Sequence, residues 1–154
     1  MKKMTEDEAF SRLSAQCAQA EHCSHEMAEK MRRWEMAEDE LAKVISRLVA
    51  ERYIDDERYA RFFVKDKLEY NKWGRRKIEQ ALFAKHITEE VRRRALDEIN
   101  NDVYAKILRP LLKNKRKTTK AASEYEMNGK LIRFAMGRGF DMEVIRRCLD
   151  CDTE

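Results

Sequence analysis

Residues that interrupt helices are scarce in this chain: only four glycines and one proline occur among its 154 residues. It also lacks the alternating runs of β-branched residues that are typical of strands. Charged residues make up 40% of the sequence and hydrophobic residues 43%, and the abundant Glu, Lys, Arg, Leu and Ala all favour helices. We therefore predict an all-α fold that contains no sheet.

Long apolar runs are missing as well. None approaches the roughly 18 residues of a membrane-spanning helix, and residues 1–8 do not resemble a signal peptide. We expect a cytoplasmic protein without membrane contact, whose four cysteines are free thiols. No Walker loop and no G-x-S-x-G motif is present. The sequence thus predicts neither catalysis nor a cofactor.

The net charge of +4 is unevenly distributed. Residues 1–51 carry 8 basic and 11 acidic side chains, residues 52–100 carry 13 and 10, and residues 101–154 carry 12 and 8. An anionic partner should therefore be attracted to the later two-thirds of the chain. The alternative is that these basic residues simply solvate helical surfaces.

Apolar residues recur at helical spacing from Phe10 to Leu149, with capping signals between the segments. We predict helix starts after Thr5 and at the caps Ser24, Asp55 and Thr88. The apolar faces of the predicted helices include Val49, Phe62 and Phe83. The predicted core residues are Ile78, Leu82, Ile87, Val91, Leu131, Phe134, Phe140 and Val144. Pro110 is expected to kink or divide a helix over 103–112, and residues 113–126 to form a loop or a frayed helix.

An internal repeat connects these segments. At an offset of 53 residues, Lys77, Ile78, Ile87 and Val91 correspond to Lys130, Leu131, Phe140 and Val144, and residues 27–49 fit more loosely at offsets of 51 and 50. The repeated pattern is a helix, a tight turn closed by an apolar side chain, and a second helix. We predict one domain over 1–154 that contains three three-helix repeats, at about 5–51, 55–99 and 101–150, in an elongated, curved, solenoid-like body.

Two stretches of the sequence resemble the RecX family. Residues 53–60 read YIDDERYA, residues 73–78 read WGRRKI, and a KHI turn follows at 85–87. The second stretch begins with KLIRF at 130–134 and ends with GRGF at 137–140. The residues that carry this likeness are Asp55, Asp56, Tyr59, Ala60, Gly74, Ile78, Leu82, Ile87, Gly139 and Phe140. The chain departs from the family pattern at Arg52 and His86, where glycine is usual. Both positions are expected helix ends, where a left-handed backbone favours glycine.

The resemblance implies a regulator that binds filaments of the RecA recombinase, and DNA within them, and that inhibits RecA activity in DNA repair, recombination and the SOS response. We expect the protein to be a monomer. It implies neither an enzyme nor a metal. A direct DNA-binding regulator of helix-turn-helix type is the alternative, because helical hairpins with arginines are also typical of that class.

Basic residues near Trp73 are the predicted contacts with RecA or DNA. Helix N-terminal N–H groups next to arginines suit phosphate, and an exposed Trp can stack on a base. The candidates are Lys72, Trp73, Arg75, Arg76, Lys77, Arg92, Arg93, Arg94, Arg133 and Arg138. The alternatives are a solvated face partly neutralised by Glu79, Glu89 and Glu90, and a Trp73 that packs rather than stacks.

Two other clusters have structural explanations that we favour. Asp55 and Asp56 resemble a catalytic carboxylate pair, but a helix N-terminus accounts for both of them. A zinc site would draw on Cys17, His22, Cys23, His25, Cys148 and Cys151. Neither end of the chain supplies a second correctly spaced pair of ligands, so free cysteines are the preferred interpretation.

Overall fold

The computed structural model describes residues 3–152, and the side chains of this range up to Asp150. This part of the chain forms nine helices and no strand, which confirms the all-α prediction. The helices are α1 (Glu6–Gln19), α2 (Ser24–Arg33), α3 (Glu38–Ala50), α4 (Asp56–Glu69), α5 (Arg75–Ala84), α6 (Glu89–Asp97), α7 (Asn101–Thr118), α8 (Glu124–Gly137) and α9 (Met142–Asp152).

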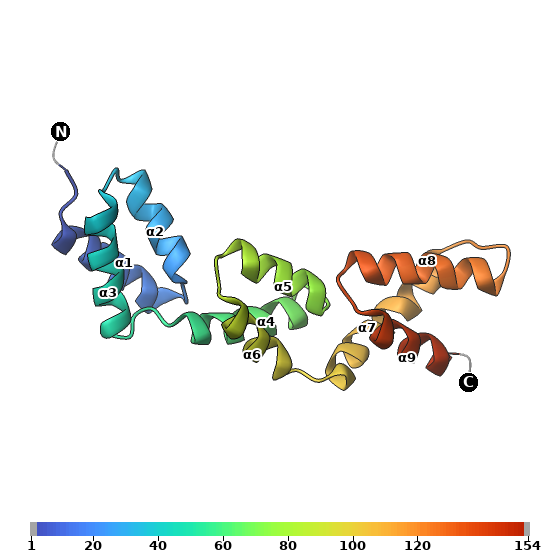
Figure 1. Ribbon diagram of the computed structural model, residues 1–154. Coiled ribbons are helices and arrows are strands. Elements are labelled where there is room, and N and C mark those ends of the chain that lie inside the picture. Colours follow the sequence, from blue (N-terminus) through green and yellow to red (C-terminus); the bar gives the residue numbers. More distant parts are fainter. Residues whose placement is uncertain (1–2, 153–154) are drawn as a thin grey trace.

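The helices pack in three successive groups of three, which follow one another along an elongated row (Figure 1). The first group is α1 to α3, the second α4 to α6 and the third α7 to α9. Within each group the first and third helices pack together, and α4 also contacts α7. We propose that the three repeats have the limits predicted above, about 5–51, 55–99 and 101–150.

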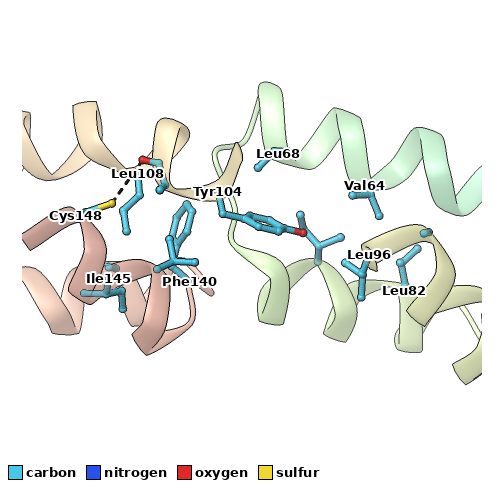
Figure 2. Close-up of a cluster of buried hydrophobic side chains, with 14 of the residues drawn as sticks. Val64, Leu68, Leu82, Leu96, Tyr104, Leu108, Phe140, Ile145 and Cys148 are labelled. Atoms are coloured by element: carbon cyan, nitrogen blue, oxygen red, sulfur yellow. Dashed lines mark hydrogen bonds between the residues drawn. The ribbon is translucent and has the colours of Figure 1, made fainter. Parts of the chain in front are cut away.

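Two hydrophobic cores hold these groups together. The first group has its own core, around Leu13, Met31 and Leu48. The second and third groups share one core, in which Tyr104 lies between the two sets of side chains (Figure 2). The last two groups are therefore joined by continuous apolar packing, to which the first group contributes the buried side chain of Cys23.

The same turn ends the middle helix of every group. Glu35, His86 and Gly139 have left-handed φ values of 60°, 59° and 97°. The next residue in each turn is Met36, Ile87 or Phe140, and each of these side chains is buried. Their N–H groups donate to the carbonyls of Met31, Leu82 and Ala135 over 3.1, 3.2 and 3.1 Å. The predicted turn closed by an apolar side chain is thus confirmed. The left-handed backbone expected at His86 and at Arg52 is confirmed as well, since Arg52 has a φ of 63°.

Most predicted core residues are buried, but five assignments to an apolar interior were wrong. Val91 and Phe134 are only partly buried and lie against the edge of the shared core. The side chains of Val49, Phe62 and Phe83 are 48%, 57% and 67% exposed. Each lies on a short amphipathic helix next to a position that does turn inward, because the apolar stripe of such a helix is wider than the face it buries.

Helix α7 corrects the prediction around Pro110. It runs unbroken from Asn101 to Thr118, so residues 113–118 are helical and only a short connection precedes α8. Proline removes one N–H from the helical ladder. Leu108 and Leu112, both fully buried, anchor the helix on either side of it. Tertiary packing therefore outweighs the local cost.

The start of α2 differs from the prediction by one residue. Cys23 rather than Ser24 is the N-cap, and its N–H donates to the Glu26 carboxylate over 3.2 Å. Ser24 instead donates hydrogen bonds to Asp56 of α4. Thr5, Asp55 and Thr88 are the caps expected, each accepting a hydrogen bond from the first turn of its helix.

No helix within residues 3–152 is long and apolar enough to cross a membrane.

Candidate functional site

The turn between α4 and α5 carries the centre of the predicted contact surface. Lys72 adopts a left-handed φ of 56°, and the Trp73 N–H then donates to the Lys67 carbonyl over 3.1 Å. The Trp73 ring is partly buried and packs against the shared core. Two ammonium groups lie over it, those of Lys67 at 5.3 Å and of Lys77 at 4.8 Å from the ring centroid. Trp73 therefore packs in the protein, and its accessible surroundings are cationic.

Gly74 joins this turn to the third group. Its N–H donates to the Arg138 carbonyl over 2.8 Å, and the Arg76 N–H donates to the Gly139 carbonyl over 2.9 Å. A Cβ at Gly74 would lie 2.3 Å from the Phe140 nitrogen, and one at Gly139 would lie 2.4 Å from the Lys77 Cβ. Only glycine fits on either side of this contact. Two residues of the RecX-like signatures thus serve to bring two turns together.

This contact gathers cations and aromatic rings from segments far apart in sequence. Arg138 donates to the Asn71 carbonyl over 3.2 Å, and its guanidinium lies 5.3 Å from the Phe134 ring centroid. The Lys115 ammonium lies at the same distance from that ring. We define the junction cluster as Lys67, Trp73, Lys77, Lys115, Phe134 and Arg138. Among the described residues, no ion pair to a carboxylate is formed by Lys77, Lys115 or Arg138, so their charge is available to an anionic partner.

Several predicted contact residues are already engaged within the protein. Arg75 forms an ion pair with Asp97 at 2.6 Å. Arg94 pairs with Glu57 at 2.8 Å and also with Glu90. These carboxylates neutralise two of the nine cations that the sequence assigned to the contact surface.

The remaining predicted cations lie at separate places. Arg76, Arg93 and Arg133 are exposed, the first on α5, the second on α6 and the third on α8. Arg92 bridges α6 and the preceding turn, since it donates to the Ile87 carbonyl over 2.7 Å. The ten candidates therefore do not form one patch, and only Trp73, Lys77 and Arg138 meet in the junction cluster.

Sequence reasoning missed Lys67 and assigned Phe134 to the interior. The position of Lys67 near Trp73 depends on the turn at Lys72. Because Lys72 has a left-handed conformation, the chain reverses direction there and Trp73 lies next to the end of α4. The Phe134–Lys115 pair requires α7 to continue past Pro110, which local sequence did not indicate.

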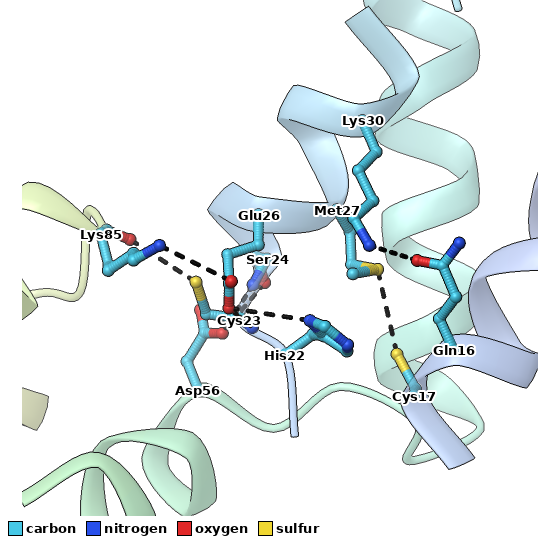
Figure 3. Close-up of polar contacts among 10 residues, drawn as sticks. All are labelled: Gln16, Cys17, His22, Cys23, Ser24, Glu26, Met27, Lys30, Asp56 and Lys85. Atoms are coloured by element: carbon cyan, nitrogen blue, oxygen red, sulfur yellow. Dashed lines mark hydrogen bonds and ion pairs between the residues drawn. The ribbon is translucent and has the colours of Figure 1, made fainter. Parts of the chain in front are cut away.

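The contact between the first and second groups relies on side chains (Figure 3). Asp56 accepts hydrogen bonds from the Ser24 N–H at 2.9 Å and its hydroxyl at 3.3 Å. The Lys85 ammonium lies 3.6 Å from Glu26, and the Cys23 thiol lies 3.9 Å from the Lys85 carbonyl. The rings of His25 and His86 stack with centroids 3.8 Å apart.

Burial affects the pKa values of the titratable groups in this contact. It raises the pKa of the Cys23 thiol to about 11. Burial also acts to raise the pKa of Glu26, but the Cys23 N–H and the Lys85 charge outweigh it and lower that pKa below its ordinary value. The thiol is thus held protonated and the carboxylate ionised, as their hydrogen bonds require.

The two acidic residues that resembled a catalytic pair are both used as caps. Asp55 accepts from the Glu57 and Arg58 N–H groups at 3.0 and 3.1 Å, as predicted. Asp56 instead caps α2 of the neighbouring group, a role that the sequence did not indicate. Among the described residues, the cysteines and histidines considered as zinc ligands are in no group of three or more side chains that could hold a metal ion. The Cys151 side chain lies outside them.

Comparisons with known proteins agree on one family. Two family models match, described as the second three-helix domain of RecX over residues 55–96 and the third over 102–149. The chain is 28% identical to the regulatory protein RecX of Bacillus cytotoxicus over 93% of its own length and 52% of that protein. It is also 28% identical to the regulatory protein RecX of Clostridium perfringens over 79% of its own length and 59% of that protein. The chain therefore spans little more than half the length of these relatives.

Solved structures show the same fold. The crystal structure of RecX from Lactobacillus salivarius superposes with a TM-score of 0.84, at 18% identity and covering 94% of both chains. A second crystal structure, of a regulatory protein RecX, gives a TM-score of 0.86 at 21% identity and covers 94% of this chain and 73% of that one.

Proposed function

The chain belongs to the RecX family of regulatory proteins, and from this premise we propose that it binds filaments of the RecA recombinase on DNA and restrains their activity. The observation that carries the proposal is the match of two successive three-helix groups, over 55–96 and 102–149, to RecX domains. The protein would act in the cytoplasm, as a monomer and without a cofactor.

The junction cluster is the part of the surface that we propose for the filament contact. A filament on DNA is strongly anionic, so it should be attracted to cations that have no carboxylate partner. Lys77 and Arg138 meet this condition and lie on two different helical groups. A partner that touches both would bind across the joint between the groups.

We also propose that the protein is not itself an enzyme. Asp55 and Asp56, the pair most similar to a catalytic dyad, are hydrogen-bonded to helix N-termini. The purified protein should therefore hydrolyse no nucleotide.

The test measures DNA-dependent ATP hydrolysis by RecA with increasing amounts of the protein. We expect hydrolysis to fall, and to fall less with Lys77→Glu, with a weaker dependence of binding on salt. Lys106→Glu is the matched control, since Lys106 is exposed on α7, outside the cluster, and the charge change is identical. Unchanged RecA turnover at saturating protein would refute the function. Equal effects of the two variants would refute the contact surface.

Binding to DNA without RecA separates this function from a direct DNA-binding regulator. Weak or sequence-independent binding to DNA alone, together with strong binding to the filament, is the expected result. Tight binding to one DNA sequence would favour the alternative.

A further inference from the structure

Helices α2, α5 and α8 each line a hollow with residues at equivalent positions of the three groups, although the hollow at α2 is also lined by α3 and by Asp56 and His86 of the second group. The α5–α6 hollow is lined by Arg76, Glu79, Gln80, Phe83 and Arg92 and has a volume of about 330 Å³. At the offset of 53, Gly129, Ile132 and Arg133 correspond to Arg76, Glu79 and Gln80, and they line a hollow of about 380 Å³ on α8. At the offset of 51, His25, Ala28, Glu29 and Arg32 line one of about 530 Å³ on α2.

The hollows therefore arise from the repeat geometry, while their linings differ. Figure 1 shows α5 and α8 on the same side of the row, with α2 at the corresponding place in the first group. Repeat proteins present such recurring surfaces to extended partners. The chemistry of each lining should then decide what binds at each group.

The α5–α6 hollow combines two guanidinium groups with an exposed ring. Phe83 is 67% exposed, and the Arg92 guanidinium lies 5.3 Å from its ring centroid. The Nε of Arg92 is buried and has no hydrogen-bond partner. Arg76 is exposed and forms no ion pair among the described residues. Arginines next to an aromatic ring are typical of the centre of protein interfaces, and a planar guanidinium is suited to a carboxylate.

The same lining disfavours a nucleic acid. The Glu79 carboxylate can accept a hydrogen bond from a peptide N–H, a donor that a phosphate backbone lacks. One face of the Phe83 ring is already near Arg92, which leaves less of the ring for a stacked base. The volume lies at the lower end of ligand sites, about 300 Å³, and suits one or two side chains of a polypeptide.

We propose that the α5–α6 hollow binds a short acidic segment of a protein partner, with a carboxylate between Arg76 and Arg92 and an apolar side chain against Phe83. The inference rests on the proposed function only in that both arginines face a partner. The new elements are the acidic character of the bound segment and its place in this hollow.

The test uses the full chain and a short fluorescent peptide in which a phenylalanine is flanked by aspartates, followed by fluorescence anisotropy. A peptide with asparagines in place of the aspartates should bind more weakly. Arg76→Glu and Phe83→Ser should each weaken binding of the acidic peptide by about tenfold, the effect of losing one charged hydrogen bond or one buried apolar contact. Arg93→Glu is the matched control, because Arg93 is exposed on the same helix as Arg92 but does not line the hollow.

Three results would overturn the inference. The first is no binding of the acidic peptide by the unaltered protein. The second is an equal loss with Arg93→Glu, which would indicate general charge attraction. The third is that Arg76→Glu and Phe83→Ser weaken the binding of a labelled oligothymidylate but leave the binding of the acidic peptide unchanged. Circular dichroism should show unchanged folding in all variants. Because no recombinase is present, failure here leaves RecA inhibition to be judged separately.

Discussion

Gly74→Ala should force apart the turn that precedes α5 and the turn that follows α8. The added Cβ would lie 2.3 Å from the Phe140 nitrogen, 2.4 Å from the Gly139 carbonyl carbon and 2.5 Å from its oxygen. These are backbone atoms of a turn whose next side chain, Phe140, is buried, so they cannot move aside locally. The two turns must move apart instead, which breaks the hydrogen bonds made by the Gly74 and Arg76 N–H groups.

The cost can be estimated from these contacts. Two backbone hydrogen bonds contribute about 1 kcal/mol each, and overpacking in a well-packed region costs about 1–3 kcal/mol. The free energy of unfolding should therefore fall by about 3–5 kcal/mol. For a chain of this size each kcal/mol lowers the melting temperature by about 2–4 °C, so Tm should drop on the order of 10 °C.

Gly129→Ala provides the matched control for thermal unfolding followed by far-ultraviolet circular dichroism. Gly129 lies inside α8, and nothing would lie within 4 Å of its added Cβ. Alanine favours a helix over glycine by about 1 kcal/mol, so Tm should rise by about 2–4 °C. A Gly74→Ala protein that melts at the wild-type temperature would refute the close contact between the two turns.

Three further changes test other parts of the structure. Phe140→Ala should lower the free energy of unfolding by about 3–5 kcal/mol in urea titrations, because the side chain is fully buried; an unchanged midpoint would contradict this. Arg52→Gly should raise the free energy of unfolding by about 0.5–1 kcal/mol, because relief of the left-handed φ of 63° outweighs the greater conformational freedom of the unfolded chain. A lower urea midpoint would argue against backbone strain at Arg52. Stability should fall as pH rises from about 9 to 11, because the buried Cys23 thiol, with its pKa raised to about 11 from the ordinary 9.0, keeps its proton in the folded state and loses it in the unfolded one. Chemical denaturation across this pH range should show a smaller loss in Cys23→Ala.

The sequence predicted the helices and their turns because those signals are local. Thr5, Asp55 and Thr88 cap helices as expected, and the position of Phe140 after a left-handed residue could be recognised from the repeat alone. These features depend on residues within one turn of each other.

The contacts between groups could not be predicted in the same way. The Asp56–Ser24 bonds and the Gly74–Arg138 bond join residues 32 and 64 positions apart. The engagement of Arg75 by Asp97 likewise depends on how α5 and α6 pack, not on local pattern. Site predictions based on charge alone therefore included cations that the fold neutralises.

The two joints of the row differ in what would loosen them. The second is fastened by main-chain atoms, those of Gly74, Arg76, Arg138 and Gly139. Any residue can supply such atoms wherever the backbone fits, so a substitution of Arg76 should leave the angle of this joint unaltered, whereas one of Arg138 would also remove its bond to the Asn71 carbonyl. The first joint depends on the side chains of Asp56, which accepts both bonds from Ser24, and of Glu26, which pairs with Lys85, so a substitution of Asp56 removes two of its contacts at once. We therefore expect the second and third groups to move as one rigid unit, and the first group to change its angle relative to them more easily.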